Sequence, residues 1–271
     1  MSSPTSKWGA FVALHQRDGA FIIPNPWDLG SAGMLAGLGF QALATTSAGL
    51  ANVMGRVDGA VTVDEKLEHC AQMCAYSPLP INADLENCYF DDPGKAATTI
   101  TRGAEVGLAG GSIEDYSPAD GGRIYSMEHS VERVHAAVEA ARAVGRPFLL
   151  TARAENLIRG VKDLDDTIAR LQAFEKAGAD VLYAPGLRTL EQVSEVASAV
   201  SKPLNVLASP FRGVTLEELG RHGAKRISVG GALARAATAA LLRAGREMQE
   251  HGTFEWTGDL ASNADVEKLL S

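Results

Sequence analysis

The chain has 271 residues, of which 46% are hydrophobic, and it carries a formal net charge of −8 at pH 7. This length allows one large buried core, and the absence of any Lys- or Arg-rich run argues against a partner such as nucleic acid or an anionic membrane. Met1–Lys7 is polar and later apolar runs are interrupted by charge, so we expect a cytoplasmic protein without a membrane span.

Short apolar segments rich in β-forming residues recur along the chain. In chain order they are Ala20–Pro24, Ala42–Thr46, Leu79–Asp84, Gly111–Glu114, Phe148–Arg153, Val181–Pro185, Leu204–Leu207 and Arg226–Val229. Continuous runs of this kind are typical of parallel strands that are buried on both faces. The pattern therefore predicts eight parallel strands.

Helical segments lie between these strands, and several of them stop at Gly or Pro. They include Asp64–Ala75, Ser130–Val144, Asp163–Ala177, Leu190–Val200 and Thr215–His222. Eight strand-helix units without a Gly-x-Gly-x-x-Gly opening favour a closed α/β fold, the (β/α)8 TIM-type barrel, over a doubly wound open sheet. We predict a single barrel domain over residues 1–271, with the barrel itself at about 18–232.

The segment 233–271 lies outside the repeat. Leu233–His251 has the composition of one long Ala/Leu/Arg helix, and a tail containing Gly, Trp and Asp follows it. An apolar helix that is not needed to complete a barrel favours packing on another subunit. We therefore expect a homo-oligomer, either a dimer or a tetramer.

Polar residues collect where the predicted strands end, which is where barrel enzymes carry their reacting groups. Asp84 and Glu86 follow the third strand, Glu114 ends the fourth, and Arg153 and Glu155 follow the fifth. Carboxylates gathered around one Arg repel each other unless a cation lies among them, and oxygen ligands suit a hard divalent ion. The sequence therefore predicts Mg²⁺, or Mn²⁺, among the carboxylates of this rim. No histidine lies at a strand end, which argues against zinc or non-haem iron.

Each of these side chains also has a simpler interpretation. A carboxylate at a strand end can cap the next helix or pair with a nearby Arg. Arg153 is either a structural ion pair with Glu155 or Glu114, or a clamp for a substrate carboxylate. Recurrence in three consecutive loops favours a functional site.

Two further segments at strand ends offer groups for a ligand. Thr45–Gly49 has hydroxyls and backbone amides that can hold a developing oxyanion. Ser228–Gly231 resembles the glycine-rich phosphate-binding turns of many barrels, although two glycines before a helix are also common packing.

The three cysteines are not expected to be catalytic or bridged. Cys88 has no histidine neighbour in sequence to activate it as a nucleophile. Together with Cys70 and Cys74 it makes too small a set for a disulfide framework or a four-ligand zinc site. We expect reduced thiols.

A series of short motifs extends from about Phe21 to His251. They are Pro24–Asp28, Gly39–Ala42, Thr46–Gly49, Gly55 with Asp58, Ala83–Glu86, Ile113–Asp115, Ala152–Glu155, Ala177–Asp180 and Pro203–Val206. In this order and spacing they resemble the isocitrate lyase and phosphoenolpyruvate mutase superfamily, in its short-chain branch. The resemblance implies a barrel, a last helix exchanged between subunits, and magnesium bound with the carboxylate and the 2-oxo or 2-hydroxy oxygen of the substrate.

The resemblance also implies roles for single residues. Asp84 matches the metal-site Asp, Glu114 matches a Glu in or behind the metal site, and Arg153 matches the Arg that binds the substrate carboxylate. Asp58 matches the Asp that orients the reacting group. The substrate-binding positions are Thr46, Ser47, Ala48 and Asn205.

The chain departs from the family pattern in two places. Asn82-Ala83-Asp84 stands where many members have an Asp-x-Asp pair, so Glu86 is expected to take over part of the metal binding. Tyr116–Arg123 lacks the Lys-Lys-Cys-Gly-His run of isocitrate and methylisocitrate lyases, and with it their cysteine acid. The Asn-Ser pair of a phosphoenolpyruvate mutase is not evident, and Ala184-Pro185-Gly186 replaces a His.

These patterns predict a lyase or decarboxylase that cleaves a carbon–carbon bond in a small 2-oxo or 2-hydroxy carboxylic acid, with metal stabilising the product oxygen. Asp58 would orient water or take a proton, and Tyr116–Ile124 would close as a lid. Two alternatives stay open. One is phosphorus–carbon chemistry, as in phosphonopyruvate hydrolysis or phosphoenolpyruvate mutation, with Arg123 as the extra cation. The other is a barrel that only binds a metabolite, which Asn82 and the missing acid motivate.

Overall fold

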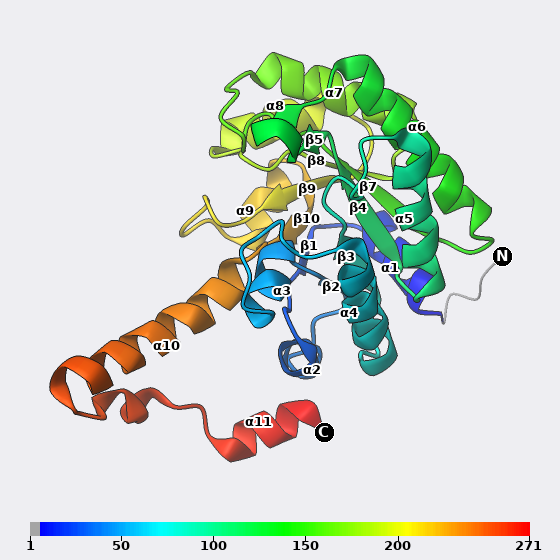
Figure 1. Cartoon of the computed structure of the whole chain (residues 1–271). Coiled ribbons are helices and arrows are strands. Elements are labelled where there is room, and N and C mark those ends of the chain that lie inside the picture. Colours follow the sequence, from blue (N-terminus) through cyan, green and yellow to red (C-terminus); the bar gives the residue numbers. More distant parts are fainter. Residues whose placement is uncertain (1–5) are drawn as a thin grey trace.

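The computed structural model describes residues 6–271, and its centre is a sheet of eight parallel strands (Figure 1). In the order in which they pair, the strands are β1 (Phe21–Ile23), β10 (Ala224–Ser228), β9 (Leu204–Leu207), β8 (Val181–Tyr183), β7 (Leu149–Arg153), β4 (Gly110–Glu114), β3 (Ile81–Asp84) and β2 (Leu43–Ala44). Each of the eight predicted strands is present, and every pairing between them is parallel.

The two ends of this sheet meet between β1 and β2. The backbone N–H of Ala44 donates to the carbonyl oxygen of Pro24, which directly follows β1, at 2.9 Å. This hydrogen bond brings the first and second strands together and nearly closes the sheet. The predicted (β/α)8 barrel is therefore confirmed, and its closure leaves little exposed strand edge.

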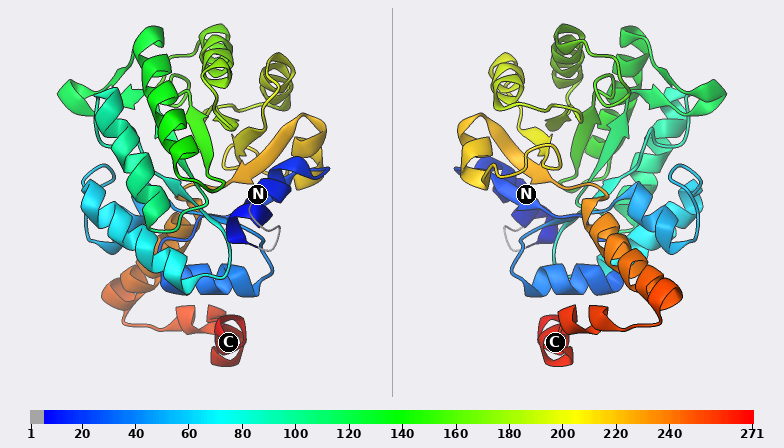
Figure 2. Two further views of the ribbon diagram at one scale, coloured as in Figure 1. Left: turned by 90° about the vertical axis from the view of Figure 1, so that its right-hand side faces the viewer. Right: turned by 90° about the vertical axis from the view of Figure 1, so that its left-hand side faces the viewer.

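Helices follow each of these eight strands, and most of them pack on the outside of the sheet (Figures 1 and 2). They are α2 (Leu29–Gly37), α3 (Ser47–Val53), α4 (Val63–Tyr76), α5 (Pro93–Glu105), α6 (Met127–Ala143), α7 (Leu164–Lys176), α8 (Leu190–Ala199), α9 (Leu216–Arg221) and α10 (Ala232–His251). Side-chain caps set their starts: Thr62 and Glu65 form a capping box at α4, and Thr215 and Glu218 form another at α9. The six helices predicted by range are present with ends shifted by a few residues.

Two elements outside the repeat were not predicted. Helix α1 (Lys7–Gln16) carries Phe11, which packs with Phe21 and Ala109 and so closes the amino-terminal end of the barrel. The stretch predicted as a lid loop contains an antiparallel hairpin, β5 (Tyr116–Ser117) and β6 (Arg123–Ile124). The pairing of these two strands orders a segment for which the sequence predicted only a loop.

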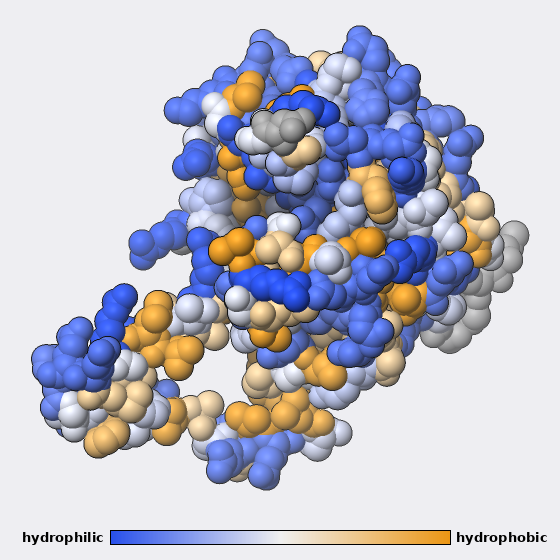
Figure 3. Space-filling view, in the orientation of Figure 1, coloured by the Kyte–Doolittle hydropathy of each residue, from blue (hydrophilic) through white to orange (hydrophobic). Residues whose placement is uncertain are grey.

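Residues 232–271 form a C-terminal arm that leaves the barrel (Figures 1 and 2). Helix α10 exposes 70% of Leu241 and 49% of Leu242, and apolar residues border the opening between arm and body (Figure 3). After η2 (Glu255–Asp259), helix α11 (Asn263–Leu270) returns to pack on α2. A Cβ at Gly37 would lie 2.3 Å from the Leu269 carbonyl oxygen, so only glycine permits this approach.

Within residues 6–271, no helix has both the length and the hydrophobicity that crossing a membrane requires.

Candidate active site

Two adjoining cavities open at the carboxyl ends of the strands, where barrel enzymes carry their active sites. The outer cavity, of about 310 Å³, is lined by residues at or after the strand ends, which include Glu86, Glu114 and Tyr116. The inner cavity, of about 210 Å³, reaches side chains of the strands themselves, including Asn205 and Arg226. Residues common to both linings are Ser47, Asp58, Asp84, Arg153 and Ile158.

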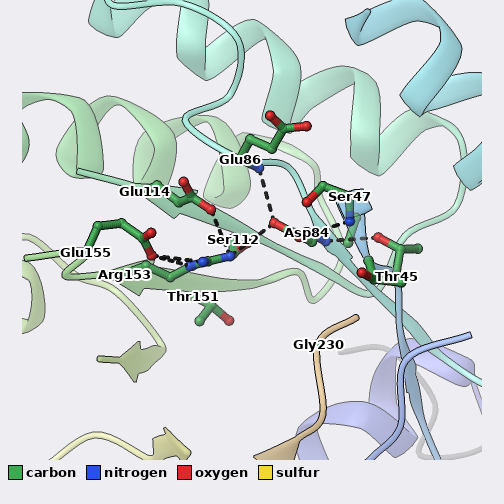
Figure 4. A network of polar contacts seen from close by, with 12 residues as sticks. Thr45, Ser47, Asp84, Glu86, Ser112, Glu114, Thr151, Arg153, Glu155 and Gly230 are labelled. Atoms are coloured by element: carbon green, nitrogen blue, oxygen red, sulfur yellow. Dashed lines mark hydrogen bonds and ion pairs between the residues drawn. The ribbon is translucent and has the colours of Figure 1, made fainter. Parts of the chain in front are cut away.

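Arg153, at the end of β7, is the centre of a network of ion pairs (Figure 4). Its Nη1 lies 2.9 Å from Oε1 of Glu114 and 3.1 Å from Oδ1 of Asp84, and its Nη2 lies 2.8 Å from Oε1 of Glu155. Although burial acts to lower it, these carboxylates raise the pKa of Arg153 well above its usual range. The ion pairs expected of the simpler interpretation are thus present, and a clamp role for Arg153 stays a prediction.

Asp84 is held in place by the backbone around it. The N–H of Ser47 donates to its Oδ2 at 3.2 Å, and the N–H of Glu86 donates to its Oδ1 at 3.3 Å. Burial acts to raise the pKa of Asp84, but Arg153 and the buried Lys66 outweigh burial and lower it. Asp84 is therefore a fixed, charged carboxylate.

The charges of the other two predicted metal ligands, Glu86 and Glu114, are less well compensated by nearby cations. Burial raises the pKa of Glu86 and raises that of Glu114 well above its usual range, and nearby carboxylates add to both shifts. Tyr89 donates its hydroxyl to Glu86 Oε1 at 3.1 Å, and Glu86 itself has a left-handed backbone with φ of 54°. A carboxylate whose pKa is raised by burial and by neighbouring carboxylates is destabilised in its charged form, and a bound cation would stabilise that form.

Asp84, Glu86 and Glu114 all line the outer cavity. The described residues nevertheless contain no group of three His, Cys, Asp or Glu side chains placed to hold a metal ion together. Mg²⁺ tolerates such a site because it keeps several of its waters and needs only one or two protein carboxylates. The donor set consists of carboxylate oxygens, of which those of Asp84 are charged and those of Glu86 and Glu114 are poorly compensated, and this chemistry fits a hard divalent ion that keeps several waters.

The predicted substrate-binding residues lie together in the inner cavity. Its lining contains Thr46, Ser47, Ala48 and Asn205. Asn205 is fixed from both sides, because its Oδ1 accepts from Arg226 Nε at 2.7 Å and its Nδ2 donates to Ser228 Oγ at 3.0 Å. The predicted catalytic Asp58 lies on an exposed loop between α3 and α4 and borders both cavities.

Two backbone amides of the glycine-rich turn after β10 already have an acceptor within the protein. The N–H groups of Val229 and Gly230 both donate to Oδ1 of Asn25, each at 2.9 Å. Asn25 thereby occupies two of the donors that a phosphate would use. These contacts agree with the second interpretation of the turn, in which its two glycines serve packing before a helix.

The β5–β6 hairpin is anchored beside the outer cavity. Asp91 accepts a hydrogen bond from Ser117 at 2.8 Å and forms an ion pair with Arg123 at 2.9 Å. Tyr116 lines the outer cavity and packs under the Arg159 guanidinium, 3.7 Å from ring centre to Cζ. Arg123, the predicted cation for a phosphonate, lines neither cavity.

Sequence reasoning missed several charged residues of the site. Arg159 lies 3.3 Å from Glu155, and their i,i+4 spacing after β7 was an available signal. Lys66 is fully buried, and its Nζ has no hydrogen-bond partner. Lys66, Cys70 and Met73 share the buried face of α4, so a cation at a core position was also visible in the sequence.

The three cysteines are free, as predicted. Cys88 is fully buried, and burial raises its pKa to about 12. A thiol of this kind stays protonated near neutral pH. The structure agrees with leaving Cys88 out of the chemistry.

Most of the chain is similar to known proteins. The sequence profile of the phosphoenolpyruvate phosphomutase family matches residues 11–249. The crystal structure of a protein from Burkholderia cenocepacia assigned as a lyase or mutase shares 52% identity and a TM-score of 0.93, covering 97% of this chain and 95% of that one. Oxaloacetate decarboxylase of Pseudomonas entomophila is 30% identical over 72% of this chain and 68% of its own length. 2-Methylisocitrate lyase of Escherichia coli is 31% identical over 66% and 62%, respectively.

The burial of the Arg153 network gives a stability prediction. In Arg153→Met, Glu155, which is 1% exposed, and Glu114 lose their closest cation, and the free energy of unfolding should fall by about 3 to 5 kcal/mol. Adding Glu155→Gln should recover part of this loss, because it removes one stranded charge. Urea unfolding measures both effects.

The matched control is Arg102→Met, which breaks a surface ion pair with Asp64. It should cost no more than about 1 kcal/mol. If Arg153→Met cost as little as Arg102→Met, the network would not be a structural constraint.

Proposed function

The chain belongs to the isocitrate lyase and phosphoenolpyruvate mutase superfamily, and on that basis we propose that it is a metal-dependent lyase or decarboxylase that cleaves a carbon–carbon bond in a small 2-oxo or 2-hydroxy carboxylic acid. The observation that carries the proposal is the group of Asp84, Glu114 and Glu155 around Arg153, at the mouth of a cavity sized for a small acid. Relatives named oxaloacetate decarboxylase and 2-methylisocitrate lyase support it.

Asp84, with Glu86 and Glu114 beside it, would hold the Mg²⁺ or Mn²⁺ ion. When bound, such an ion acts as a Lewis acid that stabilises negative charge on the substrate oxygens. The carboxylates of the outer cavity would repel an anionic substrate, so cations are required beside them for the substrate to bind.

The side chains of this chain supply orientation and proton transfer. Arg153 has a planar fork that can exchange one of its present carboxylate partners for the substrate carboxylate. Thr46, Ser47 and Ala48 line the inner cavity and orient the oxygen next to that carboxylate. Asp58, exposed at the mouth, orients water or accepts a proton. Tyr116 and Pro118 of the β5–β6 hairpin line the outer cavity, where the hairpin would limit the access of water.

Phosphorus–carbon chemistry is the alternative reaction. It is supported by the family profile that the chain matches, which is that of phosphoenolpyruvate phosphomutase. It needs a cation for the phosphonate, and Arg123, the candidate from sequence, is paired with Asp91 outside both cavities. Arg123 is therefore not placed to bind a phosphonate in either cavity. A barrel that only binds a metabolite is the second alternative, and turnover of any 2-oxo acid excludes it.

We further propose that the protein is a homodimer or homotetramer in which the C-terminal arm packs on, or is exchanged with, a neighbouring subunit. Helix α10 exposes Leu241 and Leu242, and only Ala234 and Ala244 of this helix are buried in the described chain. A long helix that buries so little apolar surface gains little stability alone. A second copy of the chain supplies the missing surface.

The oligomer is tested by light scattering at micromolar concentration. The protein should have two or four times the 28.5 kDa mass of one chain, and Leu241→Asp with Leu242→Asp should shift it toward the monomer. The control is Leu38→Asp, an equally exposed leucine on another part of the chain, which should leave the mass unchanged. A wild-type monomer would contradict the proposal.

The proposed chemistry is tested by removing either cation. Arg153→Ala should lower kcat/KM for the true substrate by at least roughly thirtyfold, because a charge-assisted interaction in a closed site is worth on the order of 2 to 5 kcal/mol. Arg153→Lys should restore only part of the loss, since it lacks the planar fork. Circular dichroism checks that each variant is folded, and enzyme treated with chelator should regain activity with added Mg²⁺. Full activity after chelation, or an active Arg153→Ala variant, would disprove the mechanism.

A further inference from the structure

The loop after β3, residues 86–91, has a strained backbone. Within residues 6–271, the non-glycine residues with positive φ are Glu86, Cys88 and Tyr89, at 54°, 57° and 67°. Residues with a Cβ rarely adopt this left-handed conformation, because the Cβ lies too close to the following carbonyl oxygen. Such strain persists only where the surrounding structure holds it, and it collects at functional sites and switch regions. This β3 loop therefore requires a group that keeps it in place.

That group is Arg133 of α6. Its Nη1 donates to the carbonyl oxygens of Phe90 and Asp91, the latter at 2.8 Å, and its Nη2 donates to the carbonyl oxygen of Asn87. Three carbonyl dipoles that point at one place repel each other, and a guanidinium replaces this repulsion with charge-assisted hydrogen bonds. Arg133 is 1% exposed and lines neither cavity, so it acts on the site only through the loop.

The end of the β3 loop is also attached to the β5–β6 hairpin. In addition to its bonds to the hairpin, the Asp91 carboxylate accepts the Tyr125 hydroxyl at 2.6 Å. Tyr125 directly follows β6, and the Arg133 guanidinium lies 4.5 Å from the centre of its ring. Arg133 thus contacts both the loop that carries Glu86 and the segment that anchors the hairpin.

Glu86 is the point at which the strained loop meets the candidate site. Its carbonyl oxygen accepts from the N–H of Glu114 at 2.9 Å, and its own N–H donates to Asp84, as Figure 4 shows. Its side chain accepts the Tyr89 hydroxyl and lines the outer cavity. Asp84 belongs to β3 itself, so relaxation of the loop would displace Glu86 and Tyr89 and leave Asp84 in place.

We propose that Arg133 is a positioning residue that holds the β3 loop closed, so that Glu86 and the β5–β6 hairpin face the outer cavity together. Without Arg133 the loop opens locally while the barrel stays folded. The consequence for metal binding rests on the proposed function, but the local opening of the loop does not.

Cys88 reports opening of the β3 loop. Its thiol is fully buried, so alkylation by iodoacetamide requires that the loop opens or that the chain unfolds. Peptide mass spectrometry separates Cys88 from the other two cysteines. Urea unfolding of the same variant gives the part of the alkylation rate that global unfolding causes.

Two substitutions release the loop to different extents. Arg133→Met removes the cation, and Arg133→Lys keeps a charge but lacks the fork that reaches several carbonyls. Each should speed alkylation of Cys88 by at least about tenfold beyond the part caused by unfolding. Low concentrations of urea should hardly change this added rate, because local opening exposes little surface.

The matched control is Arg146→Met. Arg146 also donates to three backbone carbonyls, among them those of Leu108 and Pro147, which precede β4 and β7 at the amino-terminal end of the barrel. It lies over the ring of Trp8 at 4.3 Å and lines neither cavity. Its loss should lower Tm, while alkylation of Cys88 beyond the part caused by unfolding stays within about threefold of wild type.

The strain itself is tested at Cys88. Cys88→Gly and Cys88→Ala both remove the thiol, but only glycine adopts a φ of 57° readily. In the Arg133→Lys background, Cys88→Gly should slow amide hydrogen exchange at residues 86–91 toward the wild-type rate. Cys88→Ala should leave that exchange fast, because alanine keeps the Cβ that causes the strain.

The consequence for the site is measured as Mn²⁺ affinity by electron paramagnetic resonance, without substrate. Arg133→Lys should weaken Mn²⁺ binding by about tenfold because Glu86 leaves the cavity, and Arg146→Met should not weaken it. A wild-type protein that binds no Mn²⁺ would contradict only the proposed function.

Two results would overturn the role of Arg133. One is a rate of Cys88 alkylation in Arg133→Lys that global unfolding explains in full. The other is equal hydrogen exchange at residues 86–91 for Cys88→Gly and Cys88→Ala in that background. If Arg133→Met does not fold, Arg133→Lys decides the question alone. Faster alkylation of Cys88 in Arg133→Lys with unchanged Mn²⁺ affinity would support local opening and contradict metal binding by Glu86.

Discussion

Burial of one guanidinium among three carboxylates is the constraint on which the candidate site depends. Arg153, Asp84, Glu114 and Glu155 come from three neighbouring strands or the residues just after them, and parallel strands are what bring their ends to one rim. None of these charges is stable there alone, because each would be desolvated without a partner. The barrel thus sets their positions, and their mutual pairing fixes the wall of the cavity in turn.

The same pairing leaves the mouth of the site with more negative than positive charge, while the interior holds a cation without a carboxylate. Glu86 and Glu114 have raised pKa values, and Arg226 has a lowered one, which are opposite consequences of burial without full compensation. A metal ion at the mouth would stabilise the charged form of the two carboxylates. Substrate and ion are expected to bind together for this reason, since each improves the electrostatics of the other.

The sequence identified candidate site residues that come just after a buried strand, but it did not identify those that lie inside a strand or a helix. Asp84, Glu114 and Arg153 were predictable because each ends an apolar run, and polar residues at that position in a barrel face the site. Arg226 lies inside β10 and Lys66 lies near the start of α4, so a search for polar residues at strand ends passes over both. The pairing of the β5–β6 hairpin and the return of α11 onto α2 depend on contacts between distant residues, which no local period records.

Product identity tests the central claim most directly. Purified protein with Mg²⁺ is incubated with 2-oxo and 2-hydroxy diacids and with phosphonopyruvate, and pyruvate, oxalate, glyoxylate and phosphate are followed. Carbon–carbon cleavage predicts a shortened 2-oxo acid or oxalate from at least one diacid, with no phosphate released from phosphonopyruvate. Release of phosphate without cleavage of any diacid would contradict the account and assign the site to phosphorus–carbon chemistry.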